Sequence, residues 1–516
     1  MASSVAKADT LSAADTGGMD QKLAGRSVAG VSAPASIDAT PTRTKRRDTI
    51  ASRLIFLTIC GALITTTLAY GTTHNWALAA FALSAAAIVC LWCLDGLILR
   101  SVQISINPLQ WPLLGMILLG LAQLLPLRAP DSGGLPLSPA HSLSLDPYAT
   151  RLVLVQVVCL LIYFAASFIF INTSKRLRTI ALTITSFGFL LAIFGLVQYL
   201  TTDGTRVYWF RRLTQSQAFG PFINRHHFAG YMELTMALPL GLLFSGAIEK
   251  YRRPLYIVAV TIMGVALIMT NSRGGMISVA AEILFLVIIA GPGFKHSSQE
   301  PRVRQIRAAG LRTLLAFALI GALIGGAFLI GGSEVFTRLI GTPTAADPTS
   351  GRTHFWAVTI DVIKAYPIFG SGLGSLGVVY TRYDSNNGLL RLEQAHNDYL
   401  QTLSDGGIIG GVLGLAFIVI LFRQGFARRE TSDKFRRGVA TGALAGCFAV
   451  LIHSFFDFTL HTTANALLFL ILACLATQDS RVERDSQRRR RRGHGSRSTV
   501  SEPRAVATGS SKLAEP

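Results

Sequence analysis

Long apolar runs separated by short polar segments dominate the chain from about residue 50 to residue 478. Runs of this length predict helices that cross a lipid bilayer, and the pattern predicts about twelve of them. Several are short enough to need extension or tilt. Their expected ranges are Leu54–Tyr70, Trp76–Leu99, Pro108–Leu125, Leu152–Ile171, Ile180–Leu200, His227–Ala247, Leu255–Met269, Met276–Ala290, Leu314–Ile330, Ile408–Phe422, Gly438–Phe455 and Ala464–Ala476.

The composition supports the same class of protein. Half of the 516 residues are hydrophobic and only 15% are charged, and the mean hydropathy is +0.46. This balance excludes an ordinary soluble domain. All six cysteines fall inside apolar runs, which argues against a disulfide framework or a zinc site. We therefore expect an all-α polytopic membrane protein.

Two polar tails flank the apolar region. Residues 1–48 are rich in Ala, Ser, Thr and Gly and contain no apolar run, so we expect a disordered tail and no cleavable signal peptide. Residues 479–516 are basic and polar and form a second predicted tail. The transmembrane domain is expected to occupy residues 49–478.

The positive charge follows the expected topology. Lys and Arg total 48 against 28 acidic residues, and the excess lies in short runs between apolar segments and in the tail. The positive-inside rule explains this better than nucleic-acid binding, and it predicts that both termini are cytoplasmic. A long loop, residues 331–407, then lies on the outer face.

That outer loop carries signs of local folding. The stretch "THFWAVTIDVIKAYP" reads as an amphipathic helix ended by Pro367. The following "GLGSLG" matches G-x-G-x-x-G, but no βαβ pattern surrounds it, so we do not expect a dinucleotide site. The loop is predicted to form a small folded cap on the membrane.

A histidine lies at the membrane end of this cap. In "EQAHNDYLQTLSDGG", polar residues surround His396, while apolar residues keep helical spacing. Gly406 and Gly407 are expected to end this helix just before the next membrane segment. His396 is therefore predicted to lie at the outer rim of the membrane.

The outer regions also carry arginines against the positive-inside trend. Most suit lipid headgroups or ion pairs. Arg273 differs, because it sits in a very short turn between two apolar helices, where a guanidinium needs an anion such as phosphate nearby. The arginines in these regions are Arg206, Arg211, Arg212, Arg225, Arg273, Arg338, Arg352, Arg382 and Arg391.

Two carboxyl groups, Glu233 and Glu282, fall within predicted membrane helices. Such groups are costly in a bilayer and are usually paired. Either each forms a structural salt bridge with one of the arginines, or the two shape an acceptor site.

The outer loops lack the sequence motifs of several kinds of enzyme. No D-x-D pair, H-E-x-x-H, G-x-S-x-G elbow or Walker loop is present there. We therefore expect neither a metal nor a cofactor. Arginine, glycine and His396 remain, a set suited to neutralising a phosphate leaving group while an imidazole takes a proton.

Five segments together resemble the O-antigen ligase and polymerase family of bacterial membrane glycosyltransferases. The resemblance covers Phe219 to Ala476 in order and spacing. The segments are "FGPFINRHHFAGYMELTMALPLGLL", "NSRGG", "GRTHFWAVTIDVIKAYPIFGSGLGSLG", "AHNDYLQTLSDGGIIG" and "HSFFDFTLHTTANALLFLILACLA".

This resemblance implies a metal-independent, inverting C-type glycosyltransferase on the periplasmic face of the inner membrane. The implied donor is a glycan on undecaprenyl pyrophosphate, and the implied acceptor is a hydroxyl of lipid A-core, of another glycan or of a protein. By the same resemblance, Arg273 and Arg352 would hold the pyrophosphate, and His396 would be the general base.

The resemblance leaves other roles open. Asn397 would orient the acceptor or the histidine, and Arg225 and Arg391 would make further phosphate contacts. The segment "NRHHFAG" departs from the family pattern, in which asparagine often replaces one histidine, so His226 and His227 are alternative bases.

Two other functions compete with this prediction. A polytopic transporter of a small solute or glycan would also have about twelve helices, but it should show an internal repeat, and we find none. A non-catalytic scaffold for polysaccharide assembly is the third possibility. It would leave the outer arginines and His396 dispensable.

Overall fold

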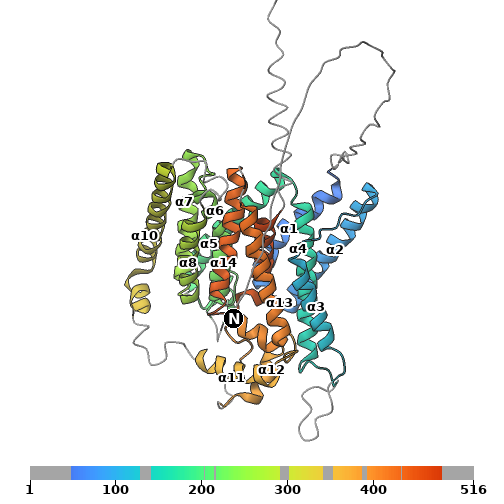
Figure 1. Cartoon of the computed structure of the whole chain (residues 1–516). Coiled ribbons are helices and arrows are strands. Elements are labelled where there is room, and N and C mark those ends of the chain that lie inside the picture. The colour runs from blue at the N-terminus through green and yellow to red at the C-terminus, as the bar shows by residue number, and fades with distance from the viewer. Residues whose placement is uncertain are drawn as a thin grey trace, which may run out of the picture. The chain divides into compact units, whose positions relative to one another are not determined.

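The computed structural model describes residues 48–127, 141–202, 204–213, 217–290, 302–340, 352–385, 392–429, 431 and 433–478. The described residues form long helices that run side by side, with short helices at one end (Figure 1). The elements are α1 (Ile50–Leu68), η1 (Tyr70–Thr72), α2 (Asn75–Leu99), α3 (Gln110–Gln123), α4 (Pro147–Phe170), α5 (Ser174–Thr202), β1 (Arg206–Val207), β2 (Arg211–Arg212), α6 (Arg225–Phe244), η2 (Lys250–Arg252), α7 (Arg253–Met269), α8 (Arg273–Ile289), α10 (Arg302–Ile340), α11 (Arg352–Ala365), α12 (Leu376–Tyr383), α13 (Asp398–Arg428), α14 (Lys434–His453), η4 (Thr459–His461) and α15 (Thr463–Thr477).

The predicted fold class, an all-α polytopic membrane protein, is confirmed. Each predicted membrane segment overlaps a helix of the structure. Among the described residues, eight helices are long and apolar enough to span a membrane by length and composition, and α3 and α15 are shorter apolar helices. The two predicted tails lie outside the described residues, apart from Asp48.

The predicted outer loop begins inside a helix of the structure. The loop was expected to begin at Gly331, but α10 continues to Ile340. Glycine inside a helix costs only about 1 kcal/mol, so the pair Gly331-Gly332 need not end a helix this long.

The packing of α6 against α14 depends on glycines. Gly438, Gly442 and Gly446 recur every fourth residue along α14, which is the small-residue spacing that lets membrane helices approach. A Cβ atom on Gly442 would overlap the backbone carbonyl of Ala237 in α6, and one on Gly446 would lie 2.5 Å from the Ala237 methyl. Only glycine allows this approach.

A kink in α13 joins the cap to the membrane helices. As expected, the backbone breaks at Gly407, where φ is 60° and ψ is −160°, although the helix resumes at once. A side chain there would overlap the carbonyl of Ile368. The kink lets the amide of Ile408 donate to the carbonyl of Pro367 at 2.8 Å.

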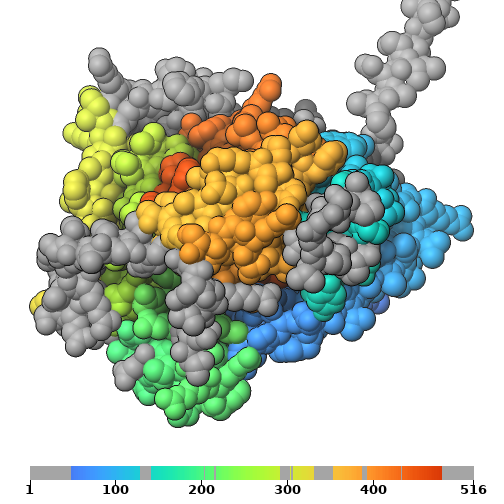
Figure 2. Space-filling view, turned by 90° about the horizontal axis from the view of Figure 1, so that it is seen from below, coloured from blue at the N-terminus to red at the C-terminus, as the bar shows by residue number. Residues whose placement is uncertain are grey.

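The cap consists of α11, α12 and the segments around them. Figure 2, which looks onto this end of the molecule, shows the cap residues over the middle of the face. The predicted amphipathic helix is α11, which buries Val358 and Val362 against Leu376 and Val379 of α12.

The glycine-rich "GLGSLG" turn is part of the joint between cap and bundle. Gln123, at the end of α3, donates to the carbonyls of Phe369 and Asp405 at 2.6 and 2.8 Å and accepts from the amide of Leu373 at 2.9 Å. These contacts give the motif a structural role.

We expect Gly442→Ala to destabilise the protein by about 1–3 kcal/mol, because overpacking would push α6 and α14 apart. The measurement is the apparent Tm of purified protein in detergent. The matched control is Gly414→Ala in α13, since a Cβ atom there meets nothing within 4 Å. Equal melting temperatures for the two variants would contradict the packing argument.

Candidate functional site

Helix ends meet between the cap and the bundle. Arg225, Arg273 and Arg352 are the first residues of α6, α8 and α11. The starts of α6 and α8 are capped by the side chains of Asn224 and Ser272. Because helix N-termini carry partial positive charge, this region favours an anion.

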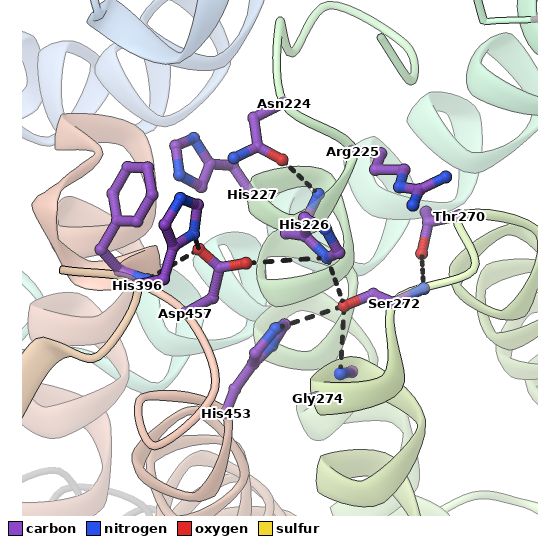
Figure 3. Close-up of polar contacts among 12 residues, drawn as sticks. Asn224, Arg225, His226, His227, Thr270, Ser272, Gly274, His396, His453 and Asp457 are labelled. Carbon is purple, nitrogen blue, oxygen red and sulfur yellow. Dashed lines mark hydrogen bonds and ion pairs between the residues drawn. The ribbon is translucent and has the colours of Figure 1, made fainter. Parts of the chain in front are cut away.

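Asp457, which follows α14, lies at the centre of the site (Figure 3). His396 Nδ1 lies 3.2 Å from its Oδ1, and Arg352 Nη2 lies 3.3 Å from its Oδ2. His226 Nδ1 lies 3.7 Å from Oδ2, and the amide of Phe458 donates to Oδ1 at 2.9 Å. The carboxylate, only 1% exposed, therefore joins α6, α11 and the turn before α13.

These neighbours keep Asp457 ionised. Burial alone would raise the pKa of the carboxyl, but the hydrogen bond from His396 and the positive charge of Arg352 outweigh it and hold the pKa of Asp457 well below its usual range. The site therefore contains a fixed negative charge that can orient an imidazole.

His396 is held from three sides. Its ring packs edge-on against Phe458, with centroids 4.9 Å apart, and stacks at 6.1 Å on Phe355 of α11. A carboxylate only accepts hydrogen bonds, so Nδ1 carries the hydrogen, and in the neutral imidazole Nε2 then keeps a lone pair. The backbone φ of His396 is 50°, which is unusual for a non-glycine residue. Such backbone conformations are concentrated at functional sites. His396 can therefore accept a proton at Nε2.

A second line of polar contacts runs from Asp457 into the bundle (Figure 3). His226 Nδ1 lies 2.9 Å from Ser272 Oγ, which lies 3.4 Å from His453 Nε2. His453 Nδ1 lies 2.8 Å from Glu233 Oε1. Ser272, His453 and Glu233 are fully buried.

The glycines of "NSRGG" make this line possible. A Cβ atom on Gly274 would lie 2.7 Å from His453 Cδ2, and one on Gly275 would lie 3.3 Å from Glu233 Oε1. The absence of side chains at these positions lets the start of α8 lie close to both groups.

The structure brings together Arg352, His396 and His226, which were candidates from the sequence. Arg225 donates to the side chain of Gln217. Arg273 is exposed at the start of α8. Arg391 lies outside the described residues.

The remaining candidates are engaged within the protein. Asn397 caps α13 by accepting from the amides of Tyr399 and Leu400, so it helps to fix the neighbouring His396. His227 is buried, and its Nδ1 lies 2.9 Å from Thr462 Oγ1.

The two membrane carboxyl groups are fully buried. Glu233 pairs with His453 and not with an arginine, so the sequence-based expectation of an arginine partner was wrong for this residue. Neither oxygen of Glu282 has a hydrogen-bond partner within the described part of the chain. Because both side chains are fully buried, neither offers a surface that a substrate could contact in this structure. The substrate-binding role expected of them stays a prediction.

Sequence reasoning missed Asp457, His453 and Ser272 as site residues. His453 and Asp457 stand four residues apart in "HSFFDF". Polar residues spaced by one helical turn at a membrane helix end are a signal that could have identified them.

Comparison with known proteins gives consistent matches. A family model described as O-antigen ligase matches residues 258–415, a range that contains Arg273, Arg352 and His396. An O-antigen ligase from Pseudomonas aeruginosa is 27% identical over 275 residues, which cover 52% of this chain and 57% of that protein. The similarity thus spans a little over half of the relative's length.

We expect Asp457→Asn to lower the free energy of unfolding by about 1–3 kcal/mol, because it weakens the acceptor shared by His396, Arg352 and the Phe458 amide. Since the folded pKa of Asp457 is depressed, its contribution is complete above about pH 4 and is lost as the pH falls further. Thermal melts between pH 3 and 8 measure both effects.

The control is Asp361→Asn, which removes an exposed carboxylate paired with Lys364 at 2.9 Å and should change stability by less than about 0.5 kcal/mol. If both variants melt alike at pH 7, Asp457 does not organise the site.

Proposed function

The chain belongs to the O-antigen ligase family, and from that premise we propose that it transfers a glycan from a polyprenyl pyrophosphate, such as undecaprenyl pyrophosphate, to an acceptor hydroxyl. The observation that carries the proposal is the Asp457 carboxylate, which aligns His396 beside Arg352. This arrangement places a proton acceptor, His396, next to a cation, Arg352, that can stabilise the negative charge of the leaving group.

His396 is the proposed general base. Asp457 holds the hydrogen on Nδ1, so Nε2 can take the proton of the acceptor hydroxyl as its oxygen forms a bond with the anomeric carbon. The bond from that carbon to the phosphate oxygen breaks, and the electron pair leaves with the pyrophosphate. A single displacement of this kind inverts the anomeric configuration.

Arg352 and Arg273 are proposed to stabilise the departing pyrophosphate. Both begin helices, so each guanidinium is backed by a helix N-terminus that favours negative charge. Arg225, which begins α6 next to His226, is a further phosphate contact. Planar guanidinium groups suit phosphate oxygens.

The location follows from the topology proposed here. With cytoplasmic termini, the cap and the site face the periplasm of a bacterial cell, and a membrane-borne donor reaches the site from the outer leaflet. Acceptors of three kinds fit the chemistry: lipid A-core sugar, another lipid-linked glycan and a protein hydroxyl.

Activity should not depend on a metal. The proposed charge stabilisation comes from arginines and helix ends, so excess EDTA should leave the rate of pyrophosphate release within about twofold of the untreated enzyme. A loss that Mg²⁺ or Mn²⁺ restores would contradict this assignment.

His396→Ala should lower the release of polyprenyl pyrophosphate by about 10²–10⁴-fold, and Arg352→Ala by about 10²–10³-fold. The assay uses reconstituted protein, lipid-linked oligosaccharide from its own host and each acceptor class in turn. His354→Ala and Arg382→Ala are matched controls, because His354 pairs with Asp384 in the cap and Arg382 is exposed on α12. Both should retain wild-type rates.

Two results would count against the proposal. If folded wild-type protein releases no pyrophosphate from verified substrate, transfer is wrong and the transporter alternative gains support. If release survives His396→Ala, the enzyme stands but the base must be another residue.

A further inference from the structure

The buried line of contacts beneath the site fixes where its protons lie. It starts at the pair formed by Glu233 and His453, whose facing atoms are 2.8 Å apart. The other nearby carboxyl, Glu282, is fully buried and has no hydrogen-bond partner in the described ranges. An unpaired charge in such surroundings is very costly, so Glu282 is neutral and gives the pair no compensating charge.

The pair itself must then be neutral overall. One form is a carboxylate with a doubly protonated imidazole, and the other is a carboxylic acid that donates to Nδ1 of a neutral imidazole. In both forms Nε2 of His453 carries a hydrogen. His453 therefore donates from Nε2 to Ser272 Oγ, 3.4 Å away.

The hydroxyl of Ser272 has one hydrogen and two lone pairs. One lone pair accepts from His453, and the other accepts from the amide of Gly275 at 3.3 Å. The hydroxyl hydrogen is left for the third neighbour, His226 Nδ1, at 2.9 Å. This is the shortest of the three contacts.

His226 Nδ1 is then an acceptor, and a neutral imidazole of this kind carries its hydrogen on Nε2. The 3.7 Å between His226 Nδ1 and Asp457 Oδ2 agrees, since it is longer than a hydrogen bond. The two imidazoles beside Asp457 thus have opposite tautomers. His396 presents a lone pair at Nε2, and His226 presents an N–H.

We propose that His226 Nε2–H binds a phosphate oxygen of the departing pyrophosphate, with Ser272, His453 and Glu233 as positioning residues that hold this tautomer. The inference rests on the proposed function for the identity of the anion. His226 keeps 19% side-chain exposure, and no described group bonds to its Nε2. It neighbours Arg225, the first residue of α6.

The first test separates a donor from a base. His226→Gln keeps an N–H group near the position of Nε2, whereas His226→Phe keeps only a ring. We expect pyrophosphate release by the Gln variant to stay within about tenfold of wild type and release by the Phe variant to fall about 10²-fold or more. Equal and severe losses in folded Gln and Phe variants would overturn the proposal.

The second test asks whether Glu233 acts through Ser272. Glu233→Gln and Ser272→Ala should each slow release about tenfold, and the double variant should be no slower than Ser272→Ala alone. Ser278→Ala is the matched control, because its buried hydroxyl donates to the Gly274 carbonyl of its own helix. Additive losses would show that Glu233 supports folding and not the tautomer.

A third measurement does not need activity. In the ¹⁵N-histidine spectrum of the full-length protein in nanodiscs, the His226 signals, assigned by their loss in His226→Gln, should show a protonated Nε2 and an unprotonated Nδ1 at pH 7. Ser272→Ala should mix the tautomers. A protonated Nδ1 in the wild type would overturn the inference. If the spectrum agrees but wild-type protein releases no pyrophosphate, the proposed function fails and the tautomer assignment stands.

Discussion

The site depends on the buried charge of Asp457. A carboxylate with 1% exposure must be surrounded by donors and cations, and the chain supplies them from three separate elements. His226 comes from the start of α6, Arg352 from the start of α11, and His396 from the turn before α13. Satisfying this one charge fixes the cap above the bundle and aligns the imidazole proposed to accept a proton.

The close approach of α6 and α14 makes that arrangement possible. Glycines every fourth residue along α14 let the two backbones touch, which brings Glu233 within 2.8 Å of His453. The glycines at the start of α8 then admit Ser272 between the two histidines. Small residues in the membrane therefore determine the hydrogen-bond chain that ends at the site.

Much of the fold could be predicted because lipid imposes length and hydrophobicity on each spanning helix. The amphipathic α11 and the break at Gly407 followed from local patterns. The end of α10 did not, since Gly331 is compatible with a continuing helix. The site was only partly predictable: His396 and Arg352 stood out by residue type, whereas the role of Asp457 arises from contacts between elements more than sixty residues apart in the sequence.

Chemical rescue of His396→Gly tests most directly whether His396 is the base. Residue 396 has a positive φ of 50°, so glycine fits the backbone while it removes the side chain that carries the imidazole. If His396 is the base, added imidazole restores pyrophosphate release in this variant and not in Arg352→Ala. Release at the wild-type rate by His396→Gly without imidazole would contradict that role.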